Sequence, residues 1–474
     1  MATLTEFQSW LKSSPLTQRE KIAAIREQWL EHLRAVPDHE VAQVLLLVKK
    51  AINSKKLRAE RDALVAQLWR DVPLAADPEP APATETPPPA PTPPQDDPTR
   101  NAELEALIAA DPEAREPYLV YADWLSARGD PRGELITIQH ELSKSPGSGG
   151  AGGRSKKMTR AQDELLAARG AELLGLLADC DDMLQGVDWH LGFIRSCRLC
   201  LSLERFNGER DSSVTVEDAL ACLLDGPGRF IQHLTVGVVR HDDNTYGRVC
   251  EVIGARPRPT LRSLFLGDFT REESELNWSK IGDASVLYAA VPNLHRLTLR
   301  SGSMKLGRIE LPELRELTTI TGGLNRAAAD SIASASWPRL ELLSLQFGRA
   351  SQGATADPTV VQPILDGQGL PALRHLGLTN CEFTDEICRA LPRCAILPQL
   401  HVLDLCMGTM SDEGAEALAS HRDALAHLKL LIVDDNYLTD AGLALLQGLC
   451  QEVALGDQRD DEADPDNRYA SAFE

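Results

Sequence analysis

The second half of the chain repeats the pattern Leu-x-x-Leu-x-Leu-x-x-(Asn/Cys/Gly), in which polar residues separate leucines at fixed intervals. Three consecutive clean copies begin at Leu373, Leu400 and Leu428, 27 and 28 residues apart. Less regular copies precede them and begin at Ile194, Ile231, Leu261, Leu294, Leu314 and Leu340. A period of this length predicts a solenoid, in which each unit buries its apolar side chains against its neighbours.

Each copy predicts one strand whose leucines point inward, followed in the later copies by a helix. Thr384, Ser411 and Thr439 each precede acidic residues and are the expected helix caps. The interval from Leu294 to Leu314 is too short for a full helix, and Cys450–Leu455 supplies the last strand. The predicted fold class is therefore α/β. The repeat fits a leucine-rich-repeat solenoid of the ribonuclease-inhibitor-like type over residues 188–458, with a curved parallel sheet and outer helices, preceded by small all-α regions.

The N-terminal part has a different pattern. Residues 1–71 predict helices with one apolar face each, the first starting at the capping box of Thr17. Residues 72–99 contain eleven prolines and no Lys or Arg, which predicts an extended linker. Residues 100–180 predict a second helical module, with a glycine-rich flexible insertion at 145–157 and a further helix over 159–178.

Within that module, the run YLVYADWLSARGDPRGELITIQ (118–139) resembles the bacterial repeat-companion domain. The resemblance implies an architecture in which a short helical module precedes a repeat array, and it implies no chemistry. From the residues themselves we expect Asp130 to cap a helix and Tyr121 and Trp124 to anchor a core. Asp123, Arg132 and Glu134 are expected to form a local charge network.

Residues 261–474 also resemble a family of uncharacterised bacterial leucine-rich-repeat proteins. The residues that carry this resemblance are LFLGDFTREESELNWSKIGD (264–283), ITGG (320–323), LRHLGLTNCEFTDEI (373–387), DLCMGTMSDEGAEAL (404–418) and the closing DNRYASAFE. The resemblance implies the solenoid fold and no established reaction. Residues 459–474 are expected to form an acidic tail after the array.

Charge and composition narrow the range of partners. The chain has a formal net charge of −21, which argues against nonspecific binding to nucleic acid or to anionic membranes. Residues 1–71 are the exception, with 12 Lys/Arg against 9 Asp/Glu. The chain shows neither a secretory start nor an apolar run long enough to cross a membrane, and its cysteines are scattered. We therefore expect a cytoplasmic protein.

The sequence shows no set of residues for catalysis, cofactor binding or metal binding. Cys197 and Cys200 stand as a lone pair whose sulfurs would face opposite sides of a strand. The histidines lack ligand spacing and pair with no nucleophile. We therefore expect neither cofactor nor metal, and a protein that is not an enzyme.

The candidate site is a surface. Residues between the inward leucines of a strand project from the concave face. In the last copies these predict a partner-binding patch in which apolar side chains are bordered by aspartates: His375, Val402, Asp404, Leu430, Ile432 and Asp434. Such patches are typical of protein-binding sites. Alternatively, the tail or the linker covers the patch.

The leading hypothesis is a non-enzymatic adaptor or scaffold that binds a protein partner of unknown identity on the concave face. Residues 1–71 would bind a second partner or self-associate. One alternative is a regulator of a partner enzyme such as a GTPase, which would need an exposed Arg or Asn on the rim of the array. Another is nucleic-acid binding through the basic cluster between Lys49 and Arg61 of the N-terminal helices, against which the interleaved Glu60 and Asp62 argue.

Overall fold

The computed structural model describes residues 100–144, 152–206, 213–241, 243–459 and 468–470, and single positions at Phe7, Trp10, Thr17, Lys21, Ala24 and Ile25. The chain divides into two units, residues 1–92 and 93–474. The predictions for the helices of residues 1–71 and for the linker at 72–99 fall almost entirely outside the described residues. All elements below belong to the second unit.

The second unit is a mixed α/β structure built on one large, mostly parallel sheet. The sheet has eleven strands in the order β1-β2-β3-β5-β7-β9-β10-β11-β12-β13-β14, and only β1 and β2 pair antiparallel. Its strands are β1 (Leu184–His190), β2 (Phe193–Leu199), β3 (His233–Val236), β5 (Ser263–Leu266), β7 (Arg296–Arg300), β9 (Glu316–Ile320), β10 (Leu342–Gly348), β11 (His375–Cys381), β12 (Val402–Asp404), β13 (Leu430–Ile432) and β14 (Val453–Ala454). Every predicted copy of the leucine pattern forms one of these strands, whereas β1 was not predicted.

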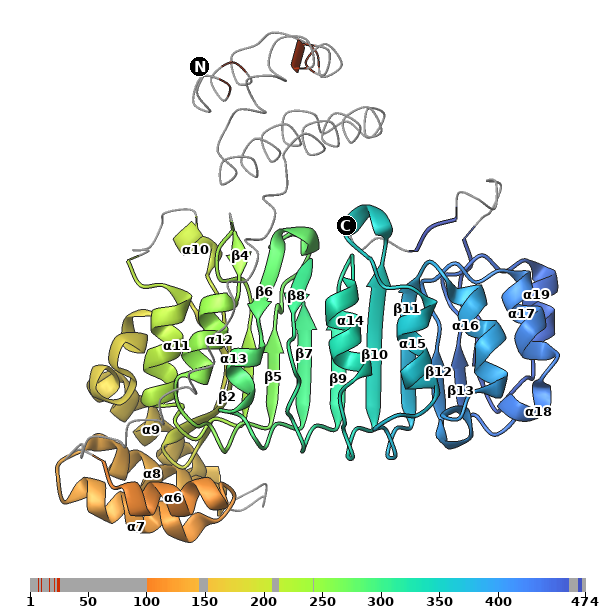
Figure 1. Cartoon of the computed structure of the whole chain (residues 1–474). Coiled ribbons are helices and arrows are strands. Elements are labelled where there is room, and N and C mark those ends of the chain that lie inside the picture. The colour runs from red at the N-terminus through yellow and green to blue at the C-terminus, as the bar shows by residue number, and fades with distance from the viewer. Residues whose placement is uncertain are drawn as a thin grey trace, which may run out of the picture. The chain divides into compact units, whose positions relative to one another are not determined.

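Helices connect the strands and lie together on one face of the sheet (Figure 1). They are α10 (Leu203–Phe206), α11 (Val216–Asp225), α12 (Gly247–Gly254), α13 (Ser285–Tyr288), α14 (Arg326–Ala333), α15 (Pro358–Leu365), α16 (Thr384–Ala390), α17 (Asp412–Ala419), α18 (Arg422–Leu425) and α19 (Asp440–Leu446). Because the connections all lie on one side, the sheet has a covered face and a second face, which we call the open face.

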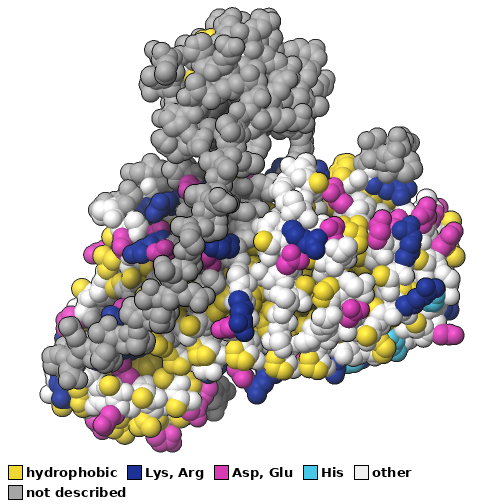
Figure 2. Space-filling model, viewed as in Figure 1, with side chains coloured by type: hydrophobic (Ala, Val, Ile, Leu, Met, Phe, Trp, Pro, Cys, Tyr) yellow, Lys and Arg dark blue, Asp and Glu magenta, His cyan; other side chains and the backbone are white. Residues whose placement is uncertain are grey.

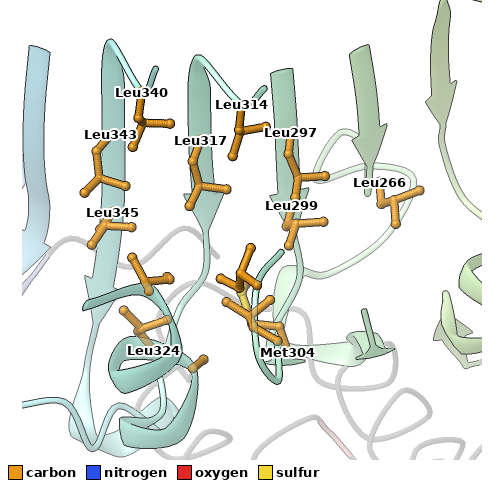
Figure 3. Packing of buried hydrophobic residues seen from close by; sticks show 14 of the residues in the cluster. Leu266, Leu297, Leu299, Met304, Leu314, Leu317, Leu324, Leu340, Leu343 and Leu345 are labelled. Atoms are coloured by element: carbon orange, nitrogen blue, oxygen red, sulfur yellow. The ribbon is translucent and has the colours of Figure 1, made fainter. Parts of the chain in front are cut away.

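The core lies between the sheet and its helices. Leucines of adjacent strands stack side by side in it, as Leu297, Leu317 and Leu343 do in Figure 3. Each of these is at most 2% exposed. Burying one such side chain contributes about 1.5–3 kcal/mol, and each leucine finds its partners on the neighbouring repeats. Stability is therefore shared along the array.

A second, smaller sheet follows the early strands. Its parallel strands are β4 (Asn244–Thr245), β6 (Ser279–Asp283) and β8 (Ser303–Lys305). The interval from Leu294 to Leu314 contains β8 and no helix, as its length predicted. The sequence did not predict this sheet, because its short strands carry no apolar alternation of their own.

Two of the three predicted helix caps form. Ser411 at the start of α17 and Thr439 at the start of α19 each accept a hydrogen bond from the backbone N–H two residues on. The prediction for Thr384 was wrong. Its side chain is buried, and its hydroxyl donates to the carbonyl oxygen of Cys381 at 2.7 Å instead of capping α16.

The two caps also join neighbouring repeats through aspartates. Asp385 in α16 accepts hydrogen bonds from the N–H (2.9 Å) and the hydroxyl (2.7 Å) of Ser411 in the next repeat. Asp412 in α17 accepts the same two bonds from Thr439 at 3.0 and 2.6 Å. The contact is thus repeated from one unit to the next, and we call it the aspartate link.

The helical module that precedes the array packs on its first strands. It consists of α6 (Ala102–Ala110), α7 (Arg115–Ser126), α8 (Pro131–Ser143) and α9 (Gly152–Leu174). Tyr118 and Tyr121 are buried against Phe193 and Phe230 of the array, so the module covers one end of the core. Trp124 is only partly buried but also packs against this cluster.

Arg132 has a different role from the one predicted. Asp130 caps α8 as expected, but Arg132 is only 6% exposed, and its guanidinium donates to the carbonyl oxygens of Gly192 (2.7 Å) and Leu173 (2.5 Å). The predicted charge network with Asp123 and Glu134 does not form, because both carboxylates lie at the surface. Arg132 instead ties the last turn of α9 to the β1–β2 turn.

Two predicted boundaries also change. Helix α9 begins at Gly152, so residues 152–157 are helical rather than part of a flexible insertion. The helix ends at Leu174 and is followed by a 3₁₀ turn at Gly175–Asp179.

At the C-terminal end of the chain, residues 468–470, which were predicted to belong to an acidic tail, pack on the array. The N–H and carbonyl of Tyr469 both bond to the hydroxyl of Tyr437 (3.2 and 3.1 Å), and Arg349 donates to the carbonyl of Ala470 (2.7 Å).

Candidate interaction surface

The strand register aligns the predicted surface residues in rows across the open face. His375, Val402 and Leu430 are paired neighbours on β11, β12 and β13. Asp404 and Ile432 form the next row, and Asp434 lies two residues beyond the end of β13. The structure therefore brings all six predicted residues onto one face of three adjacent strands.

The burial pattern matches the predicted alternation. Leu403, Leu405 and Leu431 are fully buried in the core. Val402, Leu430 and Ile432, which lie between them, are partly exposed. Successive side chains of a strand point to opposite faces of the sheet. The leucines therefore face the helices, and the side chains between them lie on the open face. The three apolar side chains thus form a small, partly exposed apolar group on the open face.

Aspartates crowd one side of this group. Asp434 is partly exposed, but its Oδ1 atom is buried without a hydrogen-bond partner among the described residues. Burial raises the pKa of Asp434, and the charges of Asp404, Asp435 and Asp457 raise it further. Asp404 accepts a hydrogen bond from the N–H of Cys406 at 3.0 Å, and burial, with these carboxylates, also raises the pKa of the Cys406 thiol.

His375 borders the apolar group on the other side. Burial lowers the pKa of His375, and the nearby charge of Asp404 opposes this shift. The imidazole is therefore less easily protonated than a free one, which suits it to a surface that excludes water.

A row of basic residues lies where the strands begin, and we call it the basic edge. One residue directly follows the first leucine or isoleucine of each copy, and these nine residues are Arg195, Gln232, Arg262, His295, Arg315, Glu341, Arg374, His401 and Lys429. From Gln232 onward, each N–H donates to the carbonyl of the residue before it in this series, at 2.7–2.9 Å. Adjacent members therefore stand side by side, about 4.8 Å apart.

The sequence analysis missed the basic edge, although its signal was present. Seven of the nine positions hold Arg, Lys or His, in a chain whose net charge is −21. The signal is one residue per repeat, so it disappears in any count over a continuous window. Aligning the copies by their first leucine would have shown it.

The described residues offer little for other chemistry. Among them, no group of three or more His, Cys, Asp or Glu side chains could hold a metal ion. Cys197 and Cys200 are both buried. A cavity of about 190 Å³ lies between the N-terminal module and the first repeat, lined by Tyr121, Arg132 and Arg229 among others. Arg132 bonds to two carbonyls there and Arg229 pairs with Glu105 at 2.5 Å, so these cations already have partners.

Comparison with known proteins supports the fold and no function. No family model matches the chain, and no curated protein matches it. Among solved structures, a Bacteroides fragilis protein is 24% identical, with a TM-score of 0.51, over 64% of this chain and 84% of its own. An internalin from Listeria monocytogenes is 18% identical, with a TM-score of 0.28, over 51% of this chain and 64% of its own. The first similarity concerns the fold alone, and the second is too weak to compare folds.

In the described part of the chain, no helix has the length and apolar character needed to cross a bilayer.

Proposed function

We propose that the second unit is a leucine-rich-repeat solenoid of the ribonuclease-inhibitor-like type, and that it serves as a non-enzymatic interaction scaffold. In this proposal, a protein partner binds the open face over β12 and β13. Residues 100–180 act as a repeat-companion module that closes one end of the array. Residues 1–71 supply a second interaction or self-association.

The observation that carries the proposal is the apolar group of Val402, Leu430 and Ile432. These side chains are partly exposed on a face that the repeat leaves without helices. Their burial by a partner would be favourable, at roughly 25 cal/mol per Å² of apolar surface. Polar and charged residues surround them on both sides, which is the usual anatomy of a protein interface.

A cytoplasmic location is part of the same proposal. All ten cysteines of the chain are free thiols in the structure. Cys381 and Cys388 are fully buried, and burial raises the pKa of both thiols. Such cysteines act as small apolar core residues, which supports a reducing compartment.

Charged substitutions in the apolar group test the proposal. The full-length protein would be used as bait in extracts of its native cells, and captured proteins would be quantified by mass spectrometry. We expect Leu430→Glu and Ile432→Glu to reduce recovery of the specific partners at least about tenfold, because a buried unpaired carboxylate at an interface costs several kcal/mol.

Val286→Glu provides the matched control. Val286 is an apolar side chain on α13 that is 45% exposed on the helical side of the array, and its substitution should leave the captured set unchanged. Thermal unfolding would show that the variants remain folded. Equal recovery by the wild type and by a folded Leu430→Glu variant would contradict binding at this face.

A further inference from the structure

Some cations of the basic edge form ion pairs with carboxylates, and others do not. Near the first strands, Arg195 pairs with Asp188 at 2.6 Å, and farther along Arg315 pairs with Glu341 at 3.2 Å. Between these two, Arg262 is half-buried and donates to the carbonyl of Pro259 at 2.6 Å. Beyond Glu341 the edge itself carries no carboxylate. Among the described residues, no carboxylate pairs with Arg374 or Lys429, and the Arg374 guanidinium bonds only to the carbonyl of Leu373 (2.9 Å).

His401 stands between these two cations on the same edge. All three side chains, Arg374, His401 and Lys429, are exposed. Loss of hydration lowers the pKa of His401, and the charges of Lys429, Arg374 and His427 lower it further. Arg374 and Lys429 thus present like charges on either side of His401, whose protonation they oppose, and this repulsion is relieved when an anionic group binds. We call these three residues the basic triplet.

The face that carries the helices shows no comparable separation of charge. Figure 2 shows acidic and basic side chains intermingled over that face, with histidine and basic side chains reaching the surface along its lower edge. Many of the cations there have ion-pair partners, as Arg326 does in Asp330 and Asp357. The unpaired triplet is therefore a local feature of the edge.

The triplet is continuous with the apolar group. His375, Val402 and Leu430 directly follow Arg374, His401 and Lys429 along the three strands. Past them, β12 ends at Asp404, and Asp434 lies two residues beyond the end of β13. Along β13, Lys429 and Asp434 are separated by five residues, or roughly 16 Å. A ligand that crosses these three strands meets positive charge first, then apolar side chains, then negative charge.

We propose that the partner of the open face binds through a short segment that places Asp or Glu side chains on the basic triplet and apolar side chains on Val402, Leu430 and Ile432. This inference rests on the function proposed above and specifies the chemistry of its partner. The acidic part of the segment is confined to one end, because Asp404 and Asp434 repel negative charge at the other.

The same arrangement disfavours nucleic acid as the occupant. A polyanion that crosses the strands would bring phosphates against Asp404 and Asp434. A polyanion that follows the edge would leave the triplet after three strands and meet Glu341, and then Arg315, which is already paired with Glu341. A protein segment varies its charge from residue to residue and avoids both penalties.

Selection from a random 12-residue peptide library on the immobilised full-length protein tests the inference. We expect selected peptides to be enriched in Asp or Glu together with Leu, Ile or Phe. The double variant Arg374→Glu/Lys429→Glu should bind these peptides at least about tenfold more weakly. Repeating the selection on that variant should enrich Lys and Arg instead. Carbodiimide coupling of the wild-type complex should join peptide carboxylates to the Lys429 amine.

The double variant Arg248→Glu/Arg389→Glu is the matched control. It reverses the same number of positive charges, but these exposed arginines lie on α12 and α16, away from the triplet. It should change peptide affinity less than about twofold. Peptides whose binding is lost in Leu430→Glu but unchanged in the triplet variant would overturn this inference and leave the proposed function standing. Failure to enrich any peptide sensitive to Leu430→Glu would contradict both. Tighter binding of a 20-nucleotide single-stranded RNA that displaces the peptides would also overturn the inference.

Discussion

Asp434 carries a carboxylate on the open face that the surrounding residues do not stabilise. Its Oδ1 atom is buried without a partner among the described residues, and Asp404, Asp435 and Asp457 surround it. Asp435 is compensated by Arg459 at 2.8 Å, but the structure gives Asp434 no such cation. An aspartate held this way costs stability when it is ionised.

The sign of its pKa shift predicts how this cost depends on pH. Because the pKa of Asp434 is raised in the folded state, the protonated carboxyl favours folding, and that contribution is lost as the pH rises through the folded pKa. Asp434→Asn, which stays neutral, should therefore raise the melting temperature at pH 7 by about 1–2 °C, since a partly exposed charge is worth less than about 1 kcal/mol.

Scanning calorimetry between pH 3 and pH 7 measures this effect, and the gain should vanish toward pH 3. Asp123→Asn, which removes an exposed carboxylate of α7, should show no such pH dependence. An Asp434→Asn variant that is less stable than the wild type at pH 7 would show that the carboxylate is favourable in the fold.

At the scale of single elements, the aspartate link explains two glycines inside helices. A Cβ atom on Gly414 of α17 would overlap Oδ1 of Asp385, and one on Gly442 of α19 would overlap Oδ1 of Asp412. The motif is therefore a hydroxyl cap, an aspartate and, two residues later, a glycine. The glycine leaves room for the aspartate of the preceding repeat.

This motif reverses the usual effect of replacing a helical glycine. Gly→Ala in a helix interior normally stabilises by roughly 0.5–1 kcal/mol. We expect Gly442→Ala instead to lower the free energy of unfolding by about 1–2 kcal/mol, because it displaces Asp412 from the Thr439 cap. Gly170→Ala in α9, where a Cβ would meet no atom within 4 Å, should be neutral or stabilising. Urea unfolding followed by circular dichroism compares the two, and a shift in the same direction would contradict the link.

How far the sequence predicts these elements depends on whether the signal lies within one repeat. The strands at Leu373, Leu400 and Leu428 were predictable because each copy carries its own leucine pattern. The cap at Thr384 was not, because its hydroxyl turns inward to a carbonyl that only the folded turn brings close. The small sheet and the basic edge were also missed, since each depends on residues that the register brings together from different repeats.

The candidate surface was predicted in part for the same reason. Alternation within β12 and β13 places Val402, Leu430 and Ile432 on the open face, and the structure agrees. The basic triplet needs the alignment of three repeats and was found only in the structure.

At the scale of the whole array, two segments outside the repeats pack on it: one covers the N-terminal end of the core, and the other lies along the C-terminal repeats. The N-terminal module buries Phe193 and Phe230. Toward the C-terminus, residues 468–470 lie across two separated repeats, because Tyr469 contacts both Tyr437 and Arg349 and Ala470 is completely buried. The predicted acidic tail over 459–474 therefore includes a segment that packs on the array.

Truncation measures the contribution of this segment. Deleting residues 468–474 should lower the melting temperature by about 2–5 °C, because it leaves the hydroxyl of Tyr437 and the guanidinium of Arg349 without these partners. Deleting only residues 471–474 keeps these contacts and serves as the control. Calorimetry would detect the difference, and equal melting temperatures for the two truncations would show that the segment contributes nothing measurable.

The aspartate link has a consequence for how such an array changes length. Each unit between Asp385 and Thr439 presents one half of the contact to the unit before it and the other half to the unit after it. A duplicated stretch such as residues 412–439, which runs from Asp412 through the Thr439 cap, would therefore arrive with both halves of its joints already encoded. Gene recombination could lengthen the C-terminal part of the array one unit at a time, and with each addition it would widen the surface on which new ligands are selected.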